Sequence, residues 1–152
     1  MRVLMVCLGN ICRSPLAEGI LKHKVRESGL NWAVDSAGTG SWHSGELPDR
    51  RSIQVARKYG IDITDQRARQ FQATDFERFD LILVMDTQNR RDVLRQAQQE
   101  VHRAKVQLIL DYLYPGQDRN VPDPYYDDDG FEAVFRMLNA ACDKLLEIPE
   151  KR

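Results

Sequence analysis

The chain has 152 residues, of which 22 are Lys or Arg and 23 are Asp or Glu, so its formal net charge is −1. This charge offers no general attraction for nucleic acid or an anionic membrane surface, and we expect neither as a partner. The three cysteines are too few for a disulfide framework, and we predict a cytoplasmic protein. The apolar run 3–8 is too short for a signal peptide or a membrane span.

Short apolar runs alternate with amphipathic segments along the chain. Such alternation predicts an α/β fold: a three-layer sandwich with a four-stranded parallel sheet and helices on both faces. The length suits a single domain, which we assign to residues 1–152. The predicted strands are 3–7, 33–36, 81–85 and 106–110, and the predicted helices are 16–27, 52–59, 89–102 and 131–147.

The segment after the first predicted strand suits an anion-binding loop. It precedes Pro15, a residue type that often begins helices, and a helix N-terminus has free backbone N–H groups and partial positive charge. Gly9 and Asn10 tolerate the positive φ that would curl several N–H groups around one centre. The segment reads Cys7-Leu8-Gly9-Asn10-Ile11-Cys12-Arg13-Ser14.

Two side chains of this loop add chemistry to the anion site. The planar guanidinium of Arg13 can hold two oxygens of a tetrahedral oxyanion, and its charge favours the thiolate form of Cys7. Ser14 can donate a hydrogen bond to the same sulfur. A thiolate at a helix N-terminus is a nucleophile near neutral pH. Taken alone, however, this spacing also fits a buried strand-end thiol and a surface arginine.

A second candidate element is Asp123-Pro124-Tyr125-Tyr126, in a segment rich in turn residues. Transfer of a phosphoryl group to sulfur requires a proton on the departing oxygen, and a carboxylic acid on a rigid loop supplies one. Pro122 and Pro124 restrict the backbone around Asp123, which would hold its carboxyl in place. An ordinary turn aspartate before proline is the plain alternative.

Together these motifs resemble the low molecular weight protein tyrosine phosphatase family, and the resemblance spans nearly the whole chain. Residues 6–15 follow its pattern V-C-x-G-N-I-C-R-S-P, residues 123–126 follow its D-P-Y-Y motif, and residues 35–39 and 80–86 resemble family segments near the second and third strands. The resemblance implies that Cys7 is the nucleophile, Arg13 binds the phosphate and the transition state, and Asp123 is the general acid and then the base. A cysteinyl-phosphate forms and is hydrolysed, with no metal or cofactor.

The resemblance also implies which residues surround the substrate. Ser36 is expected to support the loop, and the loop residues expected to bind the phosphate group are Leu8, Gly9, Asn10, Ile11, Cys12 and Ser14. Trp42, Tyr125 and Tyr126 lie in predicted loops, where they are expected to flank a phenyl ring. Packing within the domain is the alternative role for these aromatic residues.

Three alternative functions remain open at this point. Arginine-phosphate phosphatases of similar sequence carry threonine where this chain has Ile11, and an apolar residue there favours protein phosphotyrosine as the substrate. An arsenate reductase relays oxidation through further cysteines, but Cys142 lies on a predicted core face. A silent phosphopeptide-binding module would need neither Cys7 nor Asp123. By family analogy alone, a bacterial tyrosine kinase or a polysaccharide-export protein is a partner.

Some residues have more than one interpretation. Cys12 is a packing residue, a disulfide partner of Cys7, or a thiol that resolves oxidised Cys7. We expect His23, His43 and His102 at the surface, with His43 near the substrate because it follows Trp42. We expect the aspartates 127–129 to begin a helix rather than to bind a metal.

Overall fold

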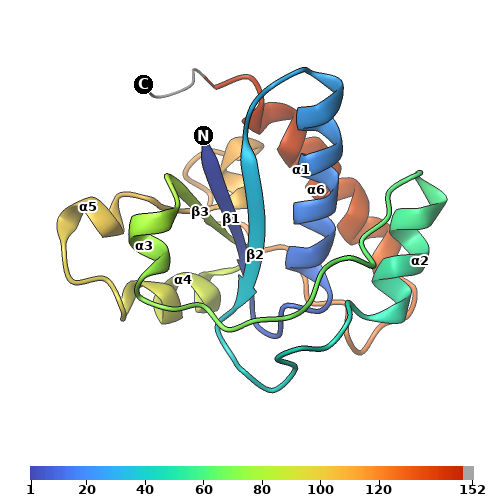
Figure 1. Ribbon diagram of the computed structural model, residues 1–152, viewed down its shortest axis with the longest axis horizontal. Helices are drawn as coiled ribbons and strands as arrows, with labels where there is room; N and C mark the ends of the chain where they lie inside the picture. The colour runs from blue at the N-terminus through green and yellow to red at the C-terminus, as the bar shows by residue number, and fades with distance from the viewer. Residues whose placement is uncertain (149–152) are drawn as a thin grey trace.

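The computed structural model describes residues 1–148, in which strands and helices alternate as predicted (Figure 1). The last four residues of the predicted domain range lie outside the described residues. The strands are β1 Arg2–Cys7, β2 Ala33–Gly38, β3 Leu81–Val84 and β4 Val106–Leu108. The helices are α1 Arg13–Glu27, α2 Arg50–Lys58, α3 Asp75–Arg78, α4 Thr87–Leu94, α5 Glu100–Arg103 and α6 Gly130–Leu145, with the 3-10 helix η1 at Ile109–Tyr112.

The four strands form one parallel sheet in the order β2-β1-β3-β4, which confirms the predicted sheet. Val3 of β1 pairs with Val34 on one side and with Leu81 on the other. Since β1 lies between β2 and β3, the connection after β1 leads to one side of this strand and the connection after β2 leads to the other side. At such a reversal of strand order, a crevice opens at the carboxyl ends of the strands. Cys7, the last residue of β1, lies at this edge beside Gly38.

Helices cover both faces of the sheet, as predicted for three layers (Figure 1). Val3 and Met5 of β1 belong to a core formed with α1, α2 and α6. Leu4 and Val6 point to the opposite face, where they join a second core with Phe76 of α3. The alternation of side chains along β1 therefore divides the apolar interior into two cores. Within residues 1–148, no helix has the length and apolar character that spanning a bilayer requires.

Helix α6 packs against α1 along the apolar face that the sequence predicted. Leu138 and Cys142 on this face are fully buried. Burial raises the pKa of the Cys142 thiol to about 12. On α1, a Cβ at Gly19 would lie 2.5 Å from a methyl carbon of Ile63, so the glycine lets this neighbouring segment approach closely.

The predicted helix 89–102 is wrong, because two helices, α4 and α5, occupy this region. The Asp86 side chain accepts a hydrogen bond from the Asn89 backbone and so begins α4 earlier than predicted. After Leu94 the hydrogen-bond spacing shortens from four residues to three. The N–H of Gln96 donates to the carbonyl of Val93, and the α-helix ends. The four-residue helix α3 was not predicted, because one turn carries no readable periodicity.

His102 was expected at the surface, and this prediction is wrong. Its ring stacks on Phe76 with the centroids 5.0 Å apart, and its Nε2 lies 2.7 Å from the Glu77 carboxylate. Only 8% of the residue is exposed. The short helix α5, which sequence periodicity did not separate from α4, turns this residue inward onto α3.

Candidate active site

Residues 7–14, here called the β1–α1 loop, comprise the last residue of β1, the connecting residues and the first two residues of α1. Helix α1 begins at Arg13 rather than at Pro15, with Cys12 as its N-cap. Asn10 has φ of 57°, in the left-handed region that few side chains other than Asn tolerate. Among residues 1–148, the backbone N–H groups of residues 9–12 find no acceptor, so they are available to an anion at the helix N-terminus.

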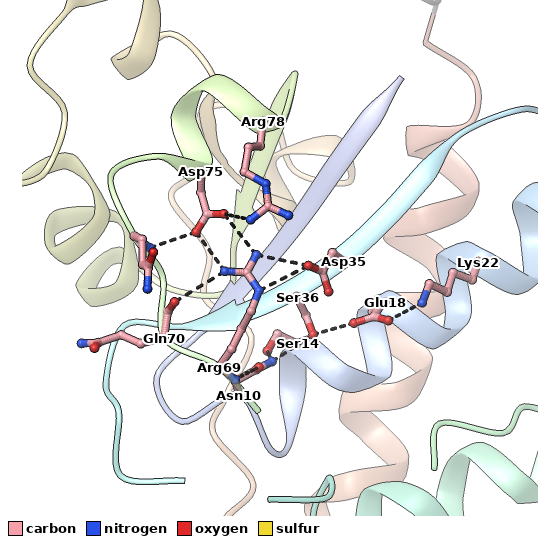
Figure 2. Close-up of polar contacts among 11 residues, drawn as sticks. Asn10, Ser14, Glu18, Lys22, Asp35, Ser36, Arg69, Gln70, Asp75 and Arg78 are labelled. Carbon is pink, nitrogen blue, oxygen red and sulfur yellow. Dashed lines mark hydrogen bonds and ion pairs between the residues drawn. The ribbon is translucent and has the colours of Figure 1, made fainter. Parts of the chain in front are cut away.

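The Asn10 carboxamide fixes the curl of this loop (Figure 2). Its Nδ2 donates to Ser14 Oγ at 2.8 Å and to Ser36 Oγ at 2.9 Å. Its Oδ1 accepts from the Arg69 backbone N–H at 3.0 Å. Ser14 Oγ lies 3.0 Å from Cys7 Sγ, and because this hydroxyl accepts from Asn10, its own hydrogen can point toward the sulfur.

Behind Ser36 the network ends in a buried carboxylate (Figure 2). Ser36 Oγ donates to Glu18 Oε1 at 2.6 Å, and Lys22 Nζ donates to Glu18 Oε2 at 2.5 Å. Burial raises the pKa of Glu18, and the hydrogen bonds from Lys22 and Ser36 oppose that shift. The donors therefore run in two directions from Asn10, one toward Glu18 and one toward Cys7.

Arg69 ties a third segment to the back of the loop (Figure 2). Its guanidinium forms hydrogen bonds with Asp35 at 3.2 and 3.3 Å and with the fully buried Asp75 at 3.1 and 3.2 Å. Its carbonyl accepts from the Gly38 N–H at 2.8 Å. A Cβ at Gly38 would lie 2.8 Å from the Leu8 carbonyl oxygen, so only glycine permits this contact between β2 and the loop.

Arg13 is buried, and protein acceptors fix its guanidinium in place. Nη1 donates to Asp86 Oδ2 at 2.7 Å and to the Val121 carbonyl at 2.9 Å, and Nη2 lies 3.8 Å from Asp123 Oδ2. Burial alone would lower the pKa of Arg13, but the negative charges of Cys7, Asp86 and Asp123 outweigh burial and raise it. The guanidinium is therefore permanently charged.

Asp86 is a residue of this site that sequence analysis did not identify. One oxygen caps α4 and the other holds Arg13. A signal was present in the sequence, because Asp86 directly follows a predicted strand, where ligand-binding residues of parallel sheets gather. The Val121 N–H bonds to the Met85 carbonyl at 2.8 Å, which fixes the segment before Asp123 to the end of β3.

A pocket of about 230 Å³ opens in front of the β1–α1 loop. It brings together most of the predicted site residues and adds His43, which lies beside Trp42 as expected. Asn10, Ser14 and Ser36 do not line it, because their side chains face the network beneath the loop. The lining residues are Cys7, Leu8, Gly9, Ile11, Cys12, Arg13, Trp42, His43, Asp123, Tyr125 and Tyr126.

Aromatic side chains form the rim of this pocket. Trp42 is 70% exposed and Tyr126 is 95% exposed, so neither packs in the core of its own domain. A Cβ at Gly40 would lie only 1.8 Å from the Trp42 ring, so the absence of a side chain at residue 40 makes room for the indole. Tyr125 and Tyr126 contact each other edge to face, with their ring centroids 5.0 Å apart.

Asp123 reaches the pocket from a loop far along the chain, whereas Cys7 lies near the N-terminus. Its Oδ1 accepts a hydrogen bond from the Tyr125 N–H at 3.1 Å, while the other oxygen faces Arg13. The side chain is 43% exposed, which leaves it accessible to a bound molecule and to water. Within residues 1–148, no group of three or more His, Cys, Asp and Glu side chains is arranged to hold a metal ion.

The other two cysteines have free, buried thiols. Cys12 belongs to the core around α1, and burial raises its pKa, with further contributions from the charges of Asp49, Cys7 and Asp123. This burial fits the packing interpretation of Cys12, while the two redox interpretations stay predictions. Cys142 lies on the buried face of α6, as its spacing predicted.

A sequence profile described as low molecular weight phosphotyrosine protein phosphatase matches residues 2–152. The chain belongs to this family. It is a protein-tyrosine phosphatase, and therefore a hydrolase. It is 45% identical over 150 residues to the low molecular weight protein-tyrosine-phosphatase of Streptomyces coelicolor, with 95% of this chain and 91% of the relative covered.

Two solved structures extend the comparison. A protein tyrosine phosphatase from Entamoeba histolytica matches with a TM-score of 0.89 at 36% identity, covering 96% of this phosphatase and 94% of that chain. The Drosophila arginine phosphatase matches with a TM-score of 0.90 at 37% identity, covering 97% and 96%. The fold is thus shared by proteins that are named for different phosphorylated residues.

The raised pKa of Glu18 predicts how its replacement affects stability. Below the ordinary glutamate pKa of about 4.3 the carboxyl is protonated in both the folded and unfolded states. As the pH rises through the raised pKa, the folded state alone resists ionisation, and the contribution of the protonated carboxyl to stability is lost. We predict that the free energy of unfolding of Glu18→Gln rises relative to that of the native protein as the pH increases through the raised pKa of Glu18.

Urea unfolding at several pH values measures this difference. Glu27→Gln, an exposed carboxylate on the same helix, is the matched control for loss of a negative charge from α1. A Glu18→Gln difference that stays flat across the range, or that falls as the pH rises, would contradict the burial argument.

Proposed function

We propose that this phosphatase hydrolyses phosphotyrosine in proteins, with Cys7 as nucleophile, Arg13 as phosphate ligand and Asp123 as general acid and base. The observation that carries the proposal is that these three side chains line one pocket, although they come from β1, the start of α1 and a loop near the other end of the chain. A binding module would need the guanidinium but neither the thiol nor the carboxyl.

In the first step, the Cys7 thiolate attacks phosphorus and a P–S bond forms. The bond from phosphorus to the phenolic oxygen breaks, and Asp123 gives its proton to that oxygen, so tyrosine leaves in the neutral form. In the second step, the Asp123 carboxylate takes a proton from water, which attacks phosphorus. The P–S bond breaks, inorganic phosphate leaves, and the thiolate is restored.

Stabilisation of charge comes from the β1–α1 loop. The N–H groups of residues 9–12 and the Arg13 guanidinium would meet the equatorial oxygens, whose charge they oppose throughout the reaction. The Ser14 hydroxyl, 3.0 Å from Cys7 Sγ, would stabilise the sulfur anion before attack and after its departure from phosphorus. Because Asp86 and Val121 already hold Arg13, little reorganisation is needed when a phosphate binds.

The walls of the pocket support an aromatic substrate. Ile11 presents an apolar side chain to the pocket, and Trp42 and Tyr125 supply flat surfaces for a phenyl ring. These features favour phosphotyrosine over phosphoarginine, although the Drosophila arginine phosphatase has a similar fold. The full burial of Cys142 and its raised pKa argue against a thiol relay of the kind that an arsenate reductase uses.

We further propose a cytoplasmic location and a bacterial phosphoprotein as the substrate. Three free cysteines support a reducing, cytoplasmic compartment. A bacterial tyrosine kinase or a polysaccharide-export protein as the physiological substrate is supported by family analogy alone.

Cys7→Ser tests the nucleophile. We predict that it lowers turnover of an aryl phosphate by at least about 10³-fold. Binding of inorganic phosphate should survive, because the loop N–H groups and Arg13 remain. Turnover assays with calorimetric phosphate titration measure both quantities, and Cys142→Ala is the control for loss of a thiol elsewhere. Retained turnover in Cys7→Ser would disprove the nucleophilic role.

Asp123→Ala tests the acid. We predict that it lowers kcat/KM by about 10²–10⁴-fold for phenyl phosphate, whose leaving group needs a proton. The loss should be much smaller for dinitrophenyl phosphate, whose leaving group is stable as an anion. Asp129→Ala, on the same loop, is the matched control. An equal loss for every leaving group would exclude Asp123 as the proton donor.

Ile11→Thr tests substrate choice. The native enzyme should hydrolyse phosphotyrosine faster than phosphoarginine, and the threonine variant should shift the ratio of the two kcat/KM values toward phosphoarginine by about tenfold. Parallel assays on both phosphoamino acids measure the ratio. Leu8→Thr introduces the same residue elsewhere in the pocket and should change the ratio less. A native enzyme that prefers phosphoarginine would overturn the phosphotyrosine proposal.

A further inference from the structure

The N-terminus of α2 is attached to the β1–α1 loop. The Asp49 N–H donates to the Ile11 carbonyl at 2.7 Å, and Ser52 Oγ donates to the Cys12 carbonyl at 3.2 Å. The Asp49 carboxylate also caps α2, because it accepts from the Arg51 N–H at 2.8 Å. The first turn of α2 therefore has a fixed position relative to the loop that carries Cys7 and Arg13.

From this turn the Arg51 side chain crosses to the loop that carries Asp123. Its Nε and Nη2 donate to the two oxygens of Asp49 at 3.0 and 2.9 Å, a two-pronged contact that fixes the plane of the guanidinium. On the other side, Nη1 donates to Asp128 Oδ1 at 2.6 Å. One cation thus bridges a carboxylate beside the β1–α1 loop and a carboxylate five positions after Asp123.

The same guanidinium also lies against two aromatic rings. Its central carbon is 5.5 Å from the centroid of the Tyr125 ring and 4.5 Å from that of Phe131, both within the range of cation–π attraction. The Tyr125 backbone in turn donates to Asp123 Oδ1. Arg51 therefore contacts the side chain of the residue whose backbone N–H orients the proposed acid.

Asp123 needs a loop that is held in place, because its contact with Arg13 does not orient the carboxyl as a proton donor. Its side chain is 43% exposed, and Arg13, at 3.8 Å, draws the carboxylate toward the phosphate site rather than toward the leaving oxygen. A fixed loop limits this movement.

We propose that Arg51 is a positioning residue that holds the loop of Asp123 in register with the β1–α1 loop. The inference rests on the proposed role of Asp123 as the acid. Arg51 need not contact the substrate; it acts through the Asp123 loop. A lysine would replace it only in part, because an ammonium keeps the charge but lacks the planar fork that engages Asp49 on one edge and Asp128 on the other.

The test measures how the loss of activity depends on the leaving group. Arg51→Met keeps the aliphatic length of the side chain and removes the fork. We expect kcat/KM to fall about tenfold for phenyl phosphate and less than about twofold for dinitrophenyl phosphate, whose departure needs no acid. Arg51→Lys should show the same selective loss to a smaller extent. Arg50→Met removes the same charge from the adjacent, exposed position and should leave the leaving-group dependence unchanged.

A double variant shows whether the effect passes through the acid. If Arg51 acts by holding Asp123, adding Arg51→Met to Asp123→Ala should reduce kcat/KM for phenyl phosphate little further. Phosphate affinity and the thermal unfolding midpoint of each variant separate this effect from general damage to the fold. An Arg51→Met loss that is equal for all leaving groups, or that persists in full in the double variant, would overturn the inference.

The two proposals can fail separately. If Asp123→Ala shows the selective loss and Arg51→Met does not, the acid role stands and the positioning role of Arg51 is wrong. If Asp123→Ala shows no selectivity, the acid role itself is wrong, whatever the result for Arg51.

Discussion

The left-handed backbone at Asn10 is the constraint on which the site depends. A single residue with φ of 57° turns the chain between β1 and α1, and its carboxamide is bonded to α1, to β2 and to the segment at Arg69. Since each partner belongs to a different part of the fold, the loop cannot change its curvature without disturbing α1, β2 or the Arg69 segment. The free N–H groups and the sulfur contact of Ser14 follow from this one conformation.

The sequence predicted the features that depend on neighbouring residues. The four strands, the helix faces and the β1–α1 loop were readable because the signals that form them are local: apolar runs, periodic side chains and a Gly-Asn pair. The partners of Arg13 were not, because Asp86 and the Val121 carbonyl lie far from it along the chain. Likewise His102 was misplaced, since its burial depends on a helix break that periodicity does not reveal and on Phe76 in another element.

The local charge around the site differs greatly from the near-neutral total of the chain. Arg13 is surrounded by Cys7, Asp86 and Asp123, so its positive charge is partly offset before any phosphate arrives. The loop N–H groups are then needed to hold an anion in so acidic a setting. We expect discrimination between phosphorylated residues to come instead from the pocket walls, where Ile11 and the aromatic rim lie. The same fold is found in phosphatases named for tyrosine and for arginine.

The contact between Arg13 and the Val121 carbonyl joins residues 108 positions apart. Closing so large a loop costs entropy, which the other contacts of the folded chain must offset. The guanidinium of Arg13 gains this partner only when residues near both ends of the chain are in place. Catalytic turnover therefore reports native structure across this whole span of the chain, whereas helical content reports only local parts of it.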